Sequence, residues 1–174
     1  LAIWRRRQQE LPSHLLQTTI QQLLHIMPGS AISDIYLQVF LTEDPLLIES
    51  AVEIATLRKS YQALPALRSA IAHWQQTNKN KYLESAFQAL GVLANEVRFL
   101  ELGMESLLLD GLTLPLEPTD ESRLKLLAAW GTQASVEVLY DLAEKATNAK
   151  VQDRLEQAAA GIRARSGQVE AGQL

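Results

Sequence analysis

Three histidines are the first residues in this chain that suggest chemistry, because imidazole is both a general base and a metal ligand. His14, His25 and His73 fall in three different predicted helices. A helix brings two ligands onto one face only at a spacing of three or four residues, and neither His-x-x-x-His nor Glu-x-x-His occurs. The sequence therefore predicts no metal site. We interpret His25, beside an apolar stripe, as a packed residue.

Two carboxylate pairs have the spacing at which a helix could hold a general acid and a general base together. They are Glu49 with Glu53 and Glu101 with Glu105. The same spacing is typical of a solvated helix face, which is how we interpret both pairs. The glycines are scattered at helix ends rather than clustered in a phosphate-binding loop. We expect no catalytic residues, no cofactor and no enzyme activity.

The tryptophans could stack on a ligand or pack in a core. Trp74 and Trp130 stand at the ends of apolar stripes, so we expect both to pack against neighbouring helices. Trp4 lies in a different context, between an apolar start and the basic triplet Arg5, Arg6 and Arg7. That order is typical of the cytoplasmic end of a transmembrane helix, and also of an amphipathic helix packed on its own domain. The first interpretation predicts a membrane tether upstream of Leu1 and a cytoplasmic location on the inner face of a membrane.

Composition favours an all-helical protein. The chain has 174 residues, 47% hydrophobic and 21% charged, with Leu and Ala dominant and only 8 Gly and 6 Pro. It has no cysteine, which excludes disulfides and thiol catalysis. With 16 basic and 20 acidic residues and a net charge of −4, we expect no nucleic-acid partner. No stretch of about 20 apolar residues spans a membrane within the chain.

Apolar residues recur at helical spacing along nearly the whole chain. Asp44 and Pro45 have the types found at a helix N-cap and first turn, and the pattern restarts at Leu64-Pro65 after a break near Ser60. In the last helix, Arg163 and Arg165 stand near the expected end, where cations suit the helix dipole. The periodicity predicts helices over residues 2–10, 14–27, 31–41, from Pro45 to a break near Ser60, 64–74, 81–94, 97–109, 120–130, through Val136 to near Asn148, and 151–164, with an extended loop at 110–119.

The chain also repeats itself, and this repeat carries a family resemblance. Residues 43–76 and 79–109 read as two similar helix pairs, with Glu-Ser-Ala at 49–51 and again at 84–86. Alanine, an apolar residue and glycine follow each other at 89–91 and 129–131, with a relative at 159–161. Together with Asp44-Pro45, Ala51 and Leu64-Pro65, these motifs resemble the HEAT-repeat family and its armadillo-like fold.

The resemblance implies an all-α, right-handed solenoid of about three to four HEAT-like helix pairs. It would cover residues 12–166, between a leading helix at 1–11 and a flexible tail at 167–174. The sequence departs from the family at the position where an arginine commonly forms a ladder between units. That position holds Ile48, Leu83, Leu124 or Gln152. A compact bundle of eight helices therefore stays open as the alternative.

A solenoid of helix pairs offers a concave face to a partner, which points to a protein-interaction scaffold. The expected face is mixed and mildly acidic, and it suits a protein or peptide partner such as a helix or a basic peptide. The alternative is the type of module found in chromophore lyases or in base-excision repair, although a repair module needs a basic groove. The predicted partner-binding residues are Ala66, Ser69, His73, Arg98, Leu102, Glu105, Glu137, Asp141 and Glu144.

Overall fold

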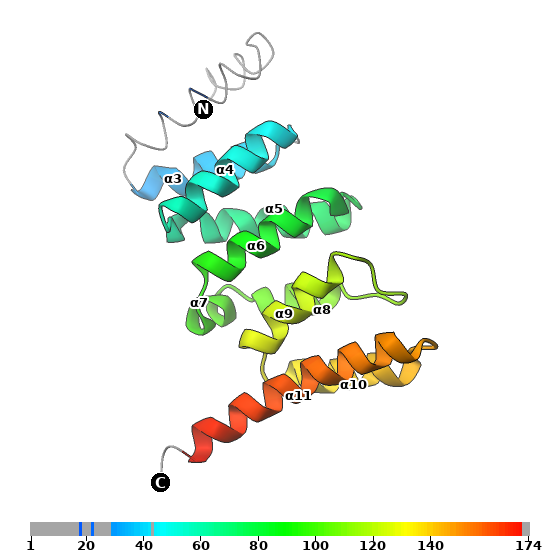
Figure 1. The fold of residues 1–174 in the computed structure, drawn as a ribbon. Helices are drawn as coiled ribbons and strands as arrows, with labels where there is room; N and C mark the ends of the chain where they lie inside the picture. The colour runs from blue at the N-terminus through cyan, green and yellow to red at the C-terminus, as the bar shows by residue number, and fades with distance from the viewer. Residues whose placement is uncertain (1–17, 19–21, 23–28, 43, 172–174) are drawn as a thin grey trace. The chain divides into compact units, whose positions relative to one another are not determined.

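A computed structural model describes residues 18, 22, 29–42 and 44–171 (Figure 1). The described residues form helices and connecting segments without a β-strand, which confirms the predicted all-α class. The leading helix, most of the predicted helix 14–27 and the basic triplet lie outside the described residues. Within the described part, no helix has both the length and the apolar content that crossing a membrane requires.

The chain divides into two compact units, residues 1–93 and 94–174. Whether they together form the one repeat domain expected over residues 12–166 stays a prediction. In the first unit, α3 packs on α4 and α5 packs on α6. In addition, α3 contacts α5 and α4 contacts α6, so the two pairs stack helix on corresponding helix (Figure 1). The elements of this unit are α3 (Gly29–Phe40), α4 (Pro45–Leu57), η1 (Tyr61–Ala63), α5 (Leu64–Gln76), η2 (Asn80–Tyr82) and α6 (Leu83–Leu93).

The predicted start of α4 and the break after it are confirmed. The Asp44 carboxylate accepts hydrogen bonds from the backbone N–H groups of Leu46 at 3.0 Å and Leu47 at 3.4 Å. These are two of the donors that the first turn of a helix leaves without partners. Pro45 occupies that turn, where its missing N–H costs nothing. After α4 the chain turns at Lys59, whose φ is +50°, and resumes as η1 and α5.

Four aromatic side chains connect the elements of the first unit. Tyr36 stacks on Phe40 with ring centroids 5.9 Å apart. Phe40 meets the edge of Trp74 at 6.1 Å, and Trp74 tilts against Tyr82 at 5.3 Å. Trp74 is fully buried, which confirms the expected core role. Burial also raises the pKa of the Tyr36 phenol, although a hydrogen bond with Ser60 opposes the rise.

The pairing of helices differs from the pairing predicted by the repeat 43–76, which joined α4 to α5. Among consecutive helices, α3 packs on α4 and α5 packs on α6, whereas α4 and α5 make little contact with each other. The repeated Glu-Ser-Ala motif nevertheless marks equivalent positions. Ala51 and Ala86 lie on α4 and α6, which pack on each other, and both side chains are buried.

In the second unit, α8 packs with α9, α10 packs with α11, and alternate helices again meet, α8 with α10 and α9 with α11. Its helices are α7 (Glu96–Glu101), α8 (Met104–Asp110), α9 (Asp120–Trp130), α10 (Gln133–Lys145) and α11 (Ala149–Ala171). Trp130 packs against Phe99 with centroids 5.5 Å apart, as expected of a residue at the end of an apolar stripe.

The largest differences from the predicted helix boundaries in this unit lie at Gly103 and at the end of α11. The apolar run 97–109 is two helices rather than one, because Gly103 adopts a left-handed conformation with φ of 62° and ends α7. At the other end of the unit, α11 continues to Ala171. The tail predicted over 167–174 is therefore helical as far as Ala171, and residues 172–174 lie outside the described residues.

Arginine side chains in the second unit hold backbone carbonyls at two places. Arg165 donates to the carbonyl oxygens of Ala129 and Gly131 and lies 3.7 Å from the Glu96 carboxylate. Arg165 therefore donates hydrogen bonds to carbonyl groups at the C-terminus of α9. The sequence instead predicts that it interacts with the dipole at the end of its own helix.

The second such arginine, Arg123, donates to the carbonyl oxygen of Gly111 and to Asp120. The Asp120 carboxylate also accepts a hydrogen bond from the N–H of Glu117 at 2.8 Å. Arg123 and Asp120 are only 3% and 2% exposed, so this ion pair fixes the predicted loop between α8 and α9 from inside the fold.

Candidate functional site

The three predicted binding residues of α5 do not share an accessible face. Ser69 is exposed, and its hydroxyl donates a hydrogen bond to the Pro65 carbonyl oxygen one turn earlier, at 3.1 Å. His73 is half-buried. Ala66 is only 1% exposed, so its predicted place on a binding surface is wrong. The physical reason is that α5 contacts both α3 and α6, which widens its buried stripe beyond the one predicted from the sequence.

The next three predicted residues, Arg98, Leu102 and Glu105, are divided between two helices. Arg98 is half-buried in α7, and Leu102 is the C-cap residue of that helix. Because the chain turns at Gly103, Glu105 belongs to α8. For the same reason Glu101 and Glu105 do not form a carboxylate pair on one helix, and a shared acid–base role loses its geometric basis.

Glu105 has a structural task that the sequence did not indicate. Its carboxylate accepts hydrogen bonds from the backbone N–H of Thr132 at 2.6 Å, from the Thr132 hydroxyl at 2.9 Å and from the buried Ser135 hydroxyl. Thr132 is the N-cap residue of α10, so the negative charge of Glu105 lies at the positive end of that helix. This residue joins α8 to α10.

Gly131, just before this cap, explains one of the alanine–glycine motifs. A Cβ added there would lie 2.6 Å from the Leu127 carbonyl oxygen and 2.8 Å from the Ser135 hydroxyl. The glycine thus permits the close turn from α9 into α10. The equivalent glycines Gly91 and Gly161 lie inside α6 and α11, so the three motifs do not share one structural role.

The remaining predicted residues, Glu137, Asp141 and Glu144, do lie together. They are all exposed on α10 at spacings of four and three residues, which places them on one side of the helix. Asp141 forms an ion pair with Lys145 at 2.7 Å. Val138, next to Glu137, is 38% exposed. We call Glu137, Val138, Asp141 and Glu144 the α10 face.

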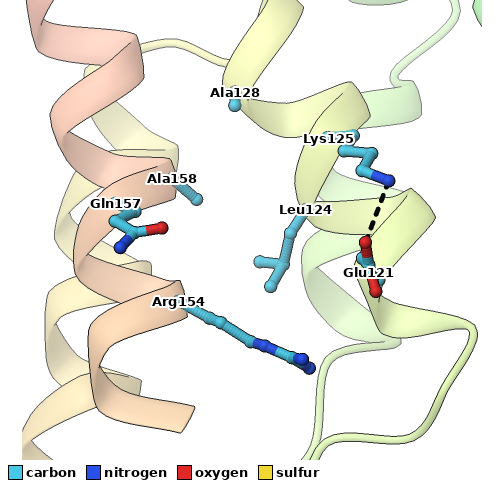
Figure 2. Close-up of a pocket in the computed structure, with 7 residues that line it drawn as sticks. All are labelled: Glu121, Leu124, Lys125, Ala128, Arg154, Gln157 and Ala158. Carbon is cyan, nitrogen blue, oxygen red and sulfur yellow. Dashed lines mark ion pairs between the residues drawn. The ribbon is translucent and has the colours of Figure 1, made fainter. Parts of the chain in front are cut away.

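A second surface feature, which the sequence reasoning missed, is an open groove between α9 and α11 (Figure 2). Its volume is about 350 Å³, at the lower end of the range for ligand pockets. Small residues on the facing sides of the two helices could have indicated this groove from the sequence, because they let the helices approach closely and leave a depression between them. The lining residues are Glu121, Leu124, Lys125, Ala128, Arg154, Gln157 and Ala158.

Charged side chains lie along the rim of this α9/α11 groove. Lys125 pairs with Glu121 at 2.9 Å along α9, and Arg154 extends from α11 across the mouth of the groove (Figure 2). The hydrogen bond and charge of Lys125, followed by the charge of Arg154, lower the pKa of Glu121. At neutral pH the rim therefore carries two positive charges and one negative charge.

The described residues include no group of three or more His, Asp or Glu side chains that could hold a metal ion. Comparisons with protein-family models, curated proteins and solved structures find no match for this chain. The HEAT-repeat resemblance thus stays a prediction from the sequence motifs. The α10 face and the α9/α11 groove are two candidate sites within the described residues.

Proposed function

We propose that this protein is a non-catalytic protein-binding module built as a right-handed α-solenoid of HEAT-like helix pairs. The observation that carries the proposal is the packing of alternate helices. Within the first unit α3 meets α5 and α4 meets α6, and within the second unit α8 meets α10 and α9 meets α11. Hairpins stacked in this way share one core and present rows of helices for binding a partner.

The α10 face is the part of the predicted binding surface that best fits a partner. Glu137 and Glu144 are exposed, and neither carboxylate is paired within the described residues. Val138 between them offers an apolar contact. A basic amphipathic helix matches this pattern, because its cations would pair with the carboxylates while an apolar residue covers Val138.

Fluorescence anisotropy with labelled basic amphipathic helices, selected from a displayed library against the whole chain, tests the proposal. We expect the doubly substituted chain Glu137→Lys with Glu144→Lys to bind the selected helices at least about tenfold more weakly. The control is Glu101→Lys with Asp153→Lys, which changes the net charge equally at exposed positions away from the α10 face. Equal weakening in both chains would show non-specific attraction and would exclude this face.

A further inference from the structure

The α9/α11 groove has a geometry of its own, separate from the α10 face. Its floor consists of Leu124 and Ala128 from α9 and Ala158 from α11. A Cβ added at Gly161 would meet the Ala128 Cβ at 3.7 Å, so α9 and α11 lie in van der Waals reach near this position. The groove has an apolar floor of small area, open to solvent along one side.

Arg154 is the charged residue of this groove whose side chain is best able to bind a ligand. Its side chain is exposed and forms no hydrogen bond or ion pair within the described part of the chain. Lys125, by contrast, is already paired with Glu121. The nearest exposed acid on α11, Asp153, is not one of the lining residues. The rim thus has one cation in excess within a chain whose net charge is −4.

We propose that the α9/α11 groove binds an acidic peptide segment, with one carboxylate on Arg154 and a neighbouring apolar side chain on the alanine floor. A guanidinium can bind a carboxylate through two parallel hydrogen bonds, which fixes the orientation of the ligand. The Gln157 amide at the same rim can donate to or accept from the peptide backbone. The Glu121 carboxylate repels a second negative charge, so the groove selects one acid beside an apolar residue rather than a run of acids.

Amide-resolved NMR titration of the whole ¹⁵N-labelled chain tests this site. The probe is acetyl-Leu-Glu-Leu-amide, and the neutral match is acetyl-Leu-Gln-Leu-amide. We expect the acidic peptide to shift amides in 121–128 and 154–161, and the neutral peptide to bind about tenfold more weakly. Arg154→Gln should abolish the difference between the two peptides. Arg163→Gln should preserve it, because Arg163 lies on the same helix but over the Tyr140 ring at 4.8 Å.

Three outcomes would overturn the proposal. They are equal shifts with both peptides, no shift in the groove at about 10 mM peptide, and sodium acetate binding as tightly as the acidic peptide. The last result would identify a simple anion site. The titration is independent of the proposed function, since a chain with Glu137→Lys and Glu144→Lys should still bind the acidic peptide in the groove.

Discussion

Replacing Glu105 by alanine tests the idea that this carboxylate is a structural cap rather than part of a binding surface. The substitution removes the acceptor for the Thr132 N–H, the Thr132 hydroxyl and the Ser135 hydroxyl. A hydrogen bond to a charged group contributes about 1.5–3 kcal/mol, and a buried partner left unsatisfied costs about 1–3 kcal/mol. Glu105 is half-buried and the Thr132 hydroxyl can turn to water, so we expect a loss of about 3 kcal/mol.

Urea unfolding followed by circular dichroism measures the loss, and hydrogen exchange locates it. Amides in the first turns of α10 should exchange faster in Glu105→Ala, because the N-terminus of that helix loses its carboxylate. Glu105→Gln keeps one acceptor oxygen and should lose about half as much free energy of unfolding. The matched control is Glu101→Ala, four residues earlier and exposed, which should change stability by less than about 0.5 kcal/mol.

A double-mutant cycle tests whether Glu105 and Ser135 stabilise the fold through their shared hydrogen bond. With Ser135→Ala already in place, the buried hydroxyl is absent, and Glu105→Ala should cost about 1 kcal/mol less than in the wild-type background. If the two substitutions add without coupling, or if Glu105→Ala is no more harmful than Glu101→Ala, Glu105 does not hold α8 to α10. The residue would then return to the set of candidate binding residues.

Three further perturbations address other contacts. Arg165→Ala should lower the free energy of unfolding by about 1–2 kcal/mol, because the C-terminal carbonyls of α9 lose their donor, whereas Arg163→Ala should have less effect in the same urea titration. Trp74→Ala should cost about 3–5 kcal/mol by leaving a cavity, and a stability equal to wild type would contradict its core position. Burial raises the folded-state pKa of Asp120 above its usual 3.8, so the folded state holds that proton more tightly than the unfolded chain does. Wild-type stability relative to Asp120→Asn should therefore fall as pH rises from 3.8 through the raised pKa, and a difference that grows with pH would refute this sign.

The sequence by itself determined the helical class and several local boundaries. The cap at Asp44, the break after α4 and the restart at Leu64 follow from the local conformational preferences of a few adjacent residues. Helical spacing also identified Trp74 as a core residue. The 35-residue offset between Glu49 and Glu84 marked α4 and α6 as equivalent helices, and the structure packs these helices on each other with Ala51 and Ala86 both buried.

Tertiary structure alone decided which helices pair and which polar groups remain accessible. Ala66 is buried in a helix that contacts both α3 and α6, and the periodicity within α5 does not show how many neighbouring helices cover it. Glu105 and Thr132 are 27 positions apart, and their hydrogen bonds exist only because α8 and α10 pack together. The α9/α11 groove likewise combines side chains about 30 positions apart. Local sequence patterns determine which face of a helix is apolar, whereas long-range packing determines how much of each face is covered.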